Sequence, residues 1–198
     1  VILVPEGDLT VKGPGTLSTQ TGSGIAVSKG ALTICEGATL NISYSGTGNG
    51  LFCNLGAMMI QNSTVTAKNT NPQSGGNGAI FANAQSGSSS SGVDSSIYIQ
   101  NSIVTAIDEK APAIYSSFGS VELESSTVTA MGYSTRYAVG AIAYSTSSGH
   151  FSIDGGVLYV KNQATYTSGN YDITYSPSKM SSANNAVIYY GNGYYNLM

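Results

Sequence analysis

The chain has 198 residues, of which 41% are hydrophobic and only 9% are charged, and its formal net charge is -3. Seven Lys and Arg residues cannot form the basic surface that a phosphate backbone requires, so we expect no nucleic-acid partner. No apolar run approaches the roughly 20 residues that span a bilayer, so we expect no membrane insertion.

The composition and the first residues predict where the protein acts. Because charged residues are scarce, Ser, Thr, Asn, Gln and Gly must cover most of the surface. The chain begins at Val1 without a charged or apolar leader, which is typical of a mature secreted protein. We therefore expect an extracellular protein at the cell surface of a bacterium.

A short phrase recurs along the chain, and its close copies end in Val-Thr-Ala. The three close and three loose copies begin at Val11, Ile34, Ile60, Ile99, Leu123 and Ile153. A recurring unit of this kind is one supersecondary element that stacks on copies of itself, because a single unit cannot bury its own apolar side. The irregular spacing excludes helical arrays of fixed period and favours β coils, whose corners accept insertions.

Within each copy the apolar residues alternate with polar ones, which predicts strands. A first strand points Ile60 inward, a corner follows at Asn62-Ser63, and a second strand points Val65 and Ala67 inward. A third strand recurs at 24–27, 50–53, 78–81, 113–115 and 140–143, with 186–189 as its sixth copy. Three short strands per coil, stacked about 4.8 Å apart, predict an all-β fold: a parallel β-helix, or β-solenoid, of about six coils.

The whole chain, 1–198, is expected to form a single β-helix domain. Its coils fall at about 9–27, 32–54, 58–83, 97–117, 121–145 and 151–190. The Ser- and Gly-rich segment 84–96 is expected to be a flexible loop. The Tyr-rich segment 161–198 is expected to cap the last coil, because a solenoid must cover the open edges of its final strands.

The repeats resemble the right-handed parallel β-helix of pectate-lyase-like proteins. Ile153–Val160 is most similar to the Ile-x-Gly-Gly-x-Val/Leu-x-Val/Ile pattern of carbohydrate-binding β-helix domains in secreted clostridial cell-surface proteins. The resemblance implies a single-stranded right-handed β-helix that binds acidic plant polysaccharide with calcium. The Gly-Asp-Gly-Ile segment of those relatives is missing here, so calcium has no motif in this chain and we expect no cofactor.

The residues that could carry catalysis are few. Glu122 and Glu124 share an outward face and could act as acid and base on a sugar, but the simpler interpretation is a solvated surface strand. The repeat places no Ser, Cys or Asp beside His150, and a single His does not support a metal site. Cys35 should face outward and Cys53 inward, which argues against a disulfide. We expect no catalytic residue, no metal and no enzyme.

One corner is the strongest ligand candidate. Insertions between the second and third strands stack on the same edge and bring together Asp108, Glu109, Tyr133, Arg136 and Tyr137. Tyrosine beside arginine and carboxylates can hold a sugar by ring packing and hydrogen bonds to hydroxyls. The alternative is a corner ion pair that two rings shield from solvent.

A threonine-rich face is also expected on the second strands. Flat threonine ladders occur in ice-binding solenoids, but Ile103, Val157 and Tyr159 interrupt this array. The preference of threonine for strands explains the face more simply.

The sequence leaves three functions open. We expect a non-catalytic extracellular β-helix module for cell-surface adhesion or carbohydrate binding, whose partner is a polysaccharide or a host or cell-surface glycan. One alternative is an atypical or degenerate polysaccharide lyase or glycoside hydrolase, and the other is a purely structural surface spacer. Because no coil carries a carboxylate cluster next to a basic residue, the sequence argues against the enzyme. Its oligomeric state stays open.

Overall fold

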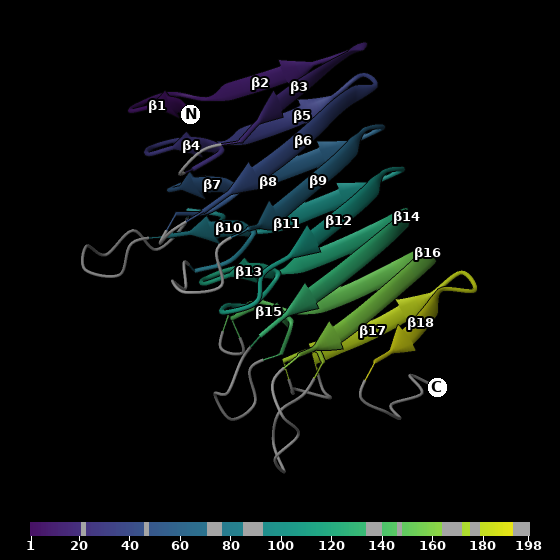
Figure 1. Cartoon of the computed structure of the whole chain (residues 1–198). Helices are drawn as coiled ribbons and strands as arrows, with labels where there is room; N and C mark the ends of the chain where they lie inside the picture. Colours follow the sequence, from purple (N-terminus) through teal and green to yellow (C-terminus); the bar gives the residue numbers. More distant parts are fainter. Residues whose placement is uncertain are drawn as a thin grey trace.

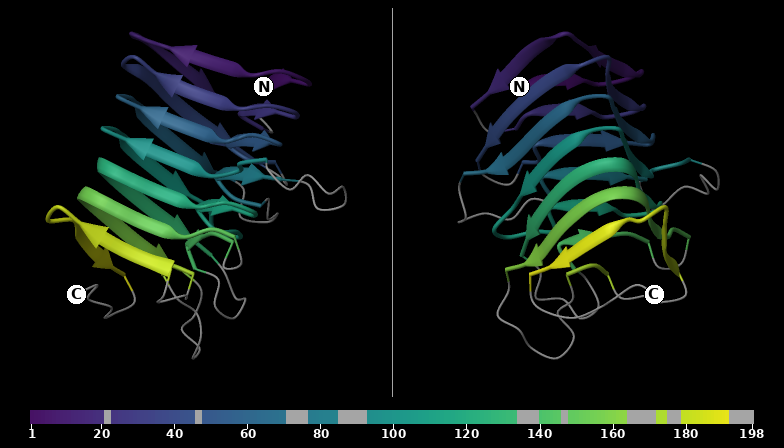
Figure 2. Two further views of the ribbon diagram at one scale, coloured as in Figure 1. Left: turned by 180° about the vertical axis from the view of Figure 1, so that it is seen from behind. Right: turned by 90° about the vertical axis from the view of Figure 1, so that its right-hand side faces the viewer.

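The computed structural model describes residues 1–20, 23–45, 48–70, 77–84, 93–133, 140–145, 148–163, 172–174 and 179–191. Within these ranges the chain is all-β, and its strands run parallel and stack from the N-terminal to the C-terminal end (Figure 1). Figure 2 shows the same stack from behind and from the side. The described residues contain no helix of the length and hydropathy that crossing a bilayer requires.

The strands form two parallel sheets. The β1 sheet has six strands in the order β1 (Ile2–Val4), β4 (Ile25–Val27), β7 (Leu51–Asn54), β10 (Ile80–Asn83), β13 (Ile114–Ser116) and β15 (Ile142–Ala143). The other sheet has twelve strands and bends back on itself, so that it forms two walls.

The first of these, the β2 wall, contains β2 (Leu9–Lys12), β5 (Leu32–Cys35), β8 (Met58–Gln61), β11 (Ile97–Gln100) and β17 (Met180–Ala183). The β3 wall contains β3 (Gly15–Thr19), β6 (Ala38–Tyr44), β9 (Thr64–Asn69), β12 (Ile103–Ile107) and β18 (Val187–Tyr190). Two long strands run through the corner and belong to both walls: β14 (Val121–Gly132) and β16 (Phe151–Asn162). The chain therefore passes the β1 sheet, the β2 wall and the β3 wall in turn, and each circuit adds one rung. This arrangement is compatible with a β-solenoid.

The recurring phrase stacks in register, as predicted. Val104 pairs with Val65 on one side and with Val128 on the other, and Val128 pairs with Leu158. All four side chains are buried in one hydrophobic core that runs through the stack. Each large aliphatic side chain contributes about 1.5–3 kcal/mol when buried, and this gain must offset the entropy of ordering the rung.

The predicted corners between the first and second strands also occur. Asn62, Asn101 and Ser125 have φ values of 46°, 47° and 46°, and Gly155 and Gly156 follow in the next rung with 68° and 78°. Asparagine and glycine adopt this left-handed conformation more readily than other residues. The corner chemistry is therefore repeated from rung to rung, although the residue type changes.

The C-terminal rung corrects the sequence-based alignment. The pattern predicts 186–189 as a strand beside 140–143, but the structure places β18 on the β3 wall, paired with residues 157–160 of β16. The β1 sheet is instead continued by a bridge from Ile142 to Ile173. Alternation of apolar residues is the same on every sheet, so it identifies a strand without identifying its sheet. Most of the predicted loop at 84–96, and parts of the predicted cap at 161–198, lie outside the described residues.

The cysteines lie as predicted. Both are free; Cys35 is half-buried and Cys53 is buried. The thiol of Cys53 donates a hydrogen bond to the carbonyl oxygen of Gly56 at 3.2 Å. Burial raises the pKa of Cys53 to about 12, so this thiol stays protonated and unreactive at neutral pH.

The core column predicts the effect of a buried charge. We expect Val128→Asp to abolish cooperative folding, because an unpaired buried carboxylate costs several kcal/mol and a domain of this size has a stability of only about 5–15 kcal/mol. Thr127→Asp is the matched control, since Thr127 is exposed on the adjacent position. Thermal unfolding followed by circular dichroism measures both, and a cooperative Val128→Asp transition would contradict the in-register core.

The burial of Cys53 predicts selective labelling. Iodoacetamide should modify the native protein at Cys35 and should modify both cysteines only after denaturation, because the thiolate is the reactive form. Mass spectrometry counts the added groups, and Cys35→Ser provides the control, since this variant should stay unlabelled while native. Rapid native labelling of Cys53 would show that the core is open at this rung.

Candidate functional site

The structure places the described residues of the predicted corner site in different surroundings. Asp108 does not reach the surface: it is fully buried, because it continues the inward alternation of Val104 and Ala106. Its Oδ2 accepts a hydrogen bond from the hydroxyl of Tyr44 at 2.6 Å and one from Nδ2 of Asn69 at 3.4 Å. Its Oδ1 accepts bonds from the backbone N–H groups of the two residues at 110 and 111, at 2.8 and 3.0 Å. Asp108 therefore has a structural role in the interior. The prediction that it lies in a surface patch is wrong.

The other residues of this corner differ in their surroundings. Glu109 is exposed, and Tyr133 is half-buried. The ammonium group of Lys110 lies 5.6 Å from the centroid of the Tyr133 ring, within range of a cation–π contact. Arg136 and Tyr137 lie outside the described residues, so the corner as a sugar-binding patch stays a prediction.

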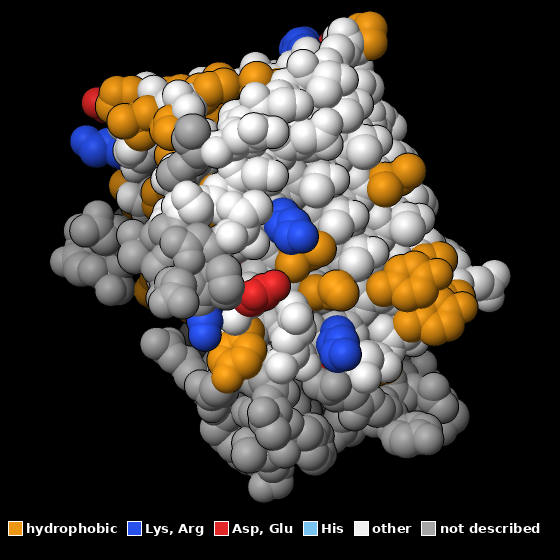
Figure 3. Space-filling model, viewed as in Figure 1, with side chains coloured by type: hydrophobic (Ala, Val, Ile, Leu, Met, Phe, Trp, Pro, Cys, Tyr) orange, Lys and Arg blue, Asp and Glu red, His pale blue; other side chains and the backbone are white. Residues whose placement is uncertain are grey.

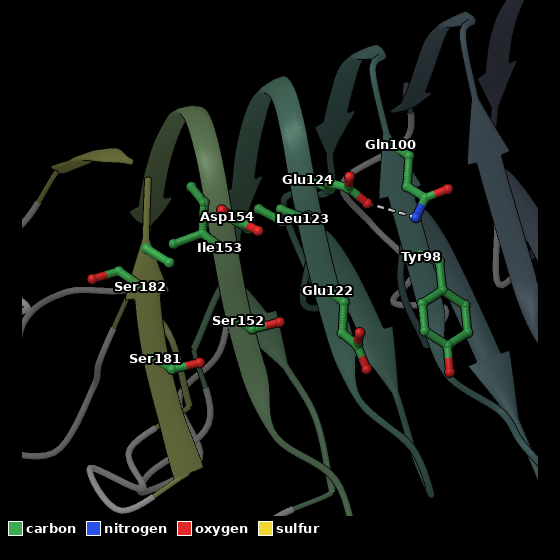
Figure 4. A pocket seen from close by; sticks show the side chains of 11 residues that line it. Tyr98, Gln100, Glu122, Leu123, Glu124, Ser152, Ile153, Asp154, Ser181 and Ser182 are labelled. Atoms are coloured by element: carbon green, nitrogen blue, oxygen red, sulfur yellow. Dashed lines mark hydrogen bonds between the residues drawn. The ribbon is translucent and has the colours of Figure 1, made fainter. Parts of the chain in front are cut away.

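A different surface offers a defined hollow. On the outer face of the β2 wall, a hollow of about 340 Å³ extends over β11, β14, β16 and β17 (Figure 4). We call it the β2 hollow; it is lined by Tyr98, Gln100, Glu122, Leu123, Glu124, Ser152, Ile153, Asp154, Ser181, Ser182 and Ala183. Because neighbouring strands are about 4.8 Å apart, four strands extend it by about 14 Å along the stack.

The strand register builds this hollow from two columns of outward residues. One column contains, in pairing order, Tyr98, Glu122, Ser152 and Ser181. The other contains Gln100, Glu124, Asp154 and Ala183. Residues two apart on a strand face the same side, so each rung contributes two groups to the same surface. Figure 4 labels these residues, apart from Ala183, on successive strands.

Hydrogen bonds hold the polar groups of the hollow in place. Nε2 of Gln100 donates to Oε2 of Glu124 at 2.8 Å, and Gln61 of the preceding rung donates to Oε1 of Gln100. Asn184 donates to Oδ1 of Asp154. Gln100 therefore makes a hydrogen bond through both its amide oxygen and its amide nitrogen.

The hydroxyl of Tyr98 is held in a similar way. It donates to Oδ2 of Asp94 at 2.9 Å. Partial burial, and the neighbouring Asp94, raise the pKa of Tyr98. The phenol therefore stays neutral at physiological pH, with its ring at the end of the β2 hollow.

The β2 hollow is acidic, and its acidity is not required by the fold. Three carboxylates line it, and none of the described lining residues is Lys or Arg. Glu124 and Asp154 lie opposite each other in register, an arrangement of like charges that destabilises a sheet. The same column holds the neutral residues Gln61 and Gln100 in earlier rungs. Glutamine therefore also fits this column, and the fold does not require a carboxylate at these two positions.

His150 has partners that the sequence pattern does not predict. Its Nδ1 lies 2.9 Å from Oγ of Ser120, and its Nε2 lies 3.4 Å from Oε1 of Glu122. The pairing of β14 with β16 explains this contact. Because Val121 pairs with Phe151, the preceding residues, Ser120 and His150, are also neighbours. The arrangement contains the residue types of a nucleophile, a base and an orienting carboxylate.

The surroundings of Ser120 do not support nucleophilic catalysis. Its side chain is buried and also accepts a hydrogen bond from the backbone N–H of His150 at 3.1 Å. The backbone N–H groups of Gly119 and Ser120 donate to the hydroxyls of Ser116 and Ser96, each at 2.9 Å. These donors are thus occupied and cannot form the oxyanion hole that acyl transfer requires. The contact instead links the residues that precede β14 and β16, and His150 also lies beside Glu122 of the β2 hollow.

Neither a metal-binding cluster nor a known relative identifies the function of this site. Within the described part of the chain, no group of three or more His, Cys, Asp or Glu side chains is arranged to hold a metal ion. No family model matches the sequence, and neither a curated protein nor a solved structure matches it. The functional interpretation therefore rests on the geometry of the described residues.

The buried contact of Asp108 predicts a measurable loss of stability. Tyr44→Phe should lower the free energy of unfolding by about 1–3 kcal/mol, because it leaves a buried carboxylate with one hydrogen bond fewer. Tyr98→Phe is the matched control: it also removes a tyrosine hydroxyl that donates to an aspartate, but at a half-exposed position, and should cost about 0.5 kcal/mol. Urea unfolding measures both variants. Equal losses would contradict the structural role of the buried pair.

Proposed function

We propose that the chain is a right-handed parallel β-helix that serves as a non-catalytic, extracellular glycan-binding module, with the β2 hollow as its binding site. The parallel in-register rungs support the β-helix, because parallel strands joined by a crossover in one sheet follow a right-handed path in about 98% of cases. The hydroxyl-rich, charge-poor composition supports an extracellular location.

The observation that carries the glycan proposal is the fixed polar array beside a tyrosine ring. Sugar hydroxyls both donate and accept hydrogen bonds. Glu122, Glu124 and Asp154 supply acceptors, Gln100 supplies an oriented amide, and the serine hydroxyls supply both roles. The ring of Tyr98 offers an apolar surface for the C–H face of a pyranose. A volume of about 340 Å³ is also sufficient for a small ligand.

The charge of the β2 hollow favours a neutral glycan. Three carboxylates, with no Lys or Arg among the described lining residues, would repel a uronate or sulfated chain. Neutral sugars avoid this repulsion, and their hydroxyls can still donate hydrogen bonds to the carboxylates. The substrate class proposed for this site therefore differs from the acidic polysaccharide that the family resemblance implies.

Two observations support binding without catalysis. Among the described residues, no Lys or Arg lines the β2 hollow and could stabilise a lyase intermediate. The nearby Ser120 is buried, and the N–H groups beside it are already hydrogen-bonded. A module that only holds a glycan needs neither feature, and it serves cell-surface adhesion directly.

Residues from neighbouring rungs provide variants that the fold tolerates. Glu124→Gln copies Gln100, and Tyr98→Met copies Met59. Each should weaken binding of a neutral oligosaccharide by about tenfold, because a charge-assisted hydrogen bond or a ring contact is lost. A glycan array identifies the sugar, and isothermal titration calorimetry measures the affinity.

A control variant and two contrary outcomes distinguish a glycan-binding module from a structural spacer and from an enzyme. Met59→Thr, which copies Thr33 on the same wall outside the hollow, should leave the affinity unchanged. A chain that binds no glycan would contradict the proposal and favour a structural spacer. New reducing ends or unsaturated products in the bound glycan would instead favour a hydrolase or a lyase.

A further inference from the structure

The outer face of the β3 wall changes character in its last two rungs. One outward column runs, in pairing order, through Thr66, Thr105, Thr129, Tyr159 and Tyr189. Three rungs fold with threonine at this position, and the next two rungs have tyrosine there. The core does not require these rings, because the position faces outward.

The two tyrosines form an exposed stacked pair. Their ring centroids are 4.8 Å apart with an interplanar angle of 7°. Tyr159 is 46% exposed, Tyr189 is 54% exposed, and Val187 beside them is 41% exposed. Figure 3 shows a hydrophobic cluster over β16 and β18 on a face that is otherwise mostly polar and uncharged. An exposed apolar patch on a polar wall is characteristic of a binding surface.

A second hollow lies beside this pair. It has a volume of about 170 Å³, and we call it the β3 hollow; it is lined by Thr129, Met131, Tyr159, Val160, Lys161, Tyr189, Tyr190 and Gly191. The aliphatic part of Lys161 packs against Gly191, where a Cβ atom would come within 2.5 Å of the lysine Cγ. The glycine thus leaves space for the lysine stem at the edge of the hollow.

The charge of the β3 wall is opposite to that of the β2 hollow. The column that contains Lys161 also contains Lys68, with Ile107 and Met131 between them. Among the described strands of this wall, no outward residue is Asp or Glu. A ligand of complementary charge is therefore an anion.

We propose that the β3 hollow is a second ligand site, which takes a pyranose ring that carries a carboxylate or a sulfate. The ring packs against the exposed tyrosine pair. The ammonium of Lys161 pairs with the anionic substituent, and the hydroxyl of Thr129 is available to a sugar hydroxyl. This site lies on another wall and binds a ligand of other charge than the β2 hollow, so it goes beyond the proposed function.

Three trisaccharides test the site on the intact chain by isothermal titration calorimetry. Trigalacturonate carries carboxylates, a sulfated galactotriose carries sulfate, and unmodified galactotriose is neutral. At least one anionic trisaccharide should bind about fivefold more tightly than the neutral one, and added salt should reduce this preference. Binding of only one anion also supports the site, and it identifies the substituent.

Residues at equivalent positions in neighbouring rungs again provide the substitutions. Lys161→Met copies Met131 and keeps the aliphatic stem, while Tyr159→Thr with Tyr189→Thr copies Thr129. Each should weaken binding of the anionic trisaccharide about fivefold to tenfold. Lys68→Ile, which copies Ile107 and removes the same charge from the same wall, should leave the affinity unchanged.

Several results would overturn this site. They are equal binding of the neutral and the anionic trisaccharides by the Glu124→Gln variant, whose β2 hollow is weakened, no binding of any of the three, or equal effects of Lys161→Met and Lys68→Ile. Thermal unfolding verifies that each variant folds, and if the double tyrosine variant does not, Lys161→Met alone decides. Glu124→Gln should not change this affinity, so loss of binding in that variant would assign the anion to the β2 hollow instead.

Discussion

The structure depends on the in-register pairing of parallel strands between successive rungs. Because every rung repeats the backbone path of the one before, residues at equivalent positions lie about 4.8 Å apart along the stack. Inside, this brings Val65, Val104, Val128 and Leu158 into one buried column. Outside, the same pairing arranges polar side chains into columns of equal regularity. The core and the surface therefore follow from a single constraint.

This constraint also separates residues that the fold needs from residues that it merely allows. A position that holds threonine or glutamine in several rungs is satisfied by those residues. Departures such as Glu124 in one wall and Tyr159 in the other then require another explanation. Both departures lie in the C-terminal half of the stack, Glu124 in the β2 hollow and Tyr159 in the β3 hollow. The two proposed sites arise from these departures.

Alternation and corner residues made much of the fold predictable. Inward side chains, corners such as Asn62, and the separate orientations of the cysteines follow from a period of two and from backbone preference. The sheet to which 187–190 belongs did not follow, because alternation is identical on every sheet. Asp108 was assigned to the surface because it lies in a corner insertion, although its parity with Ala106 indicated the interior. The β2 hollow and the contact of Ser120 with His150 needed the exact register between rungs, which depends on long-range pairing.

The opposite positions of the first and last rungs determine how the molecule responds to force. The N-terminal strands and β18 lie at the two ends of the stack (Figure 1), so tension applied there acts along the direction of the hydrogen bonds between strands. The rungs then carry the tension in series, and an end rung can detach while the remainder stays folded. A protein built in this way would extend stepwise under tension and would not unfold in a single event.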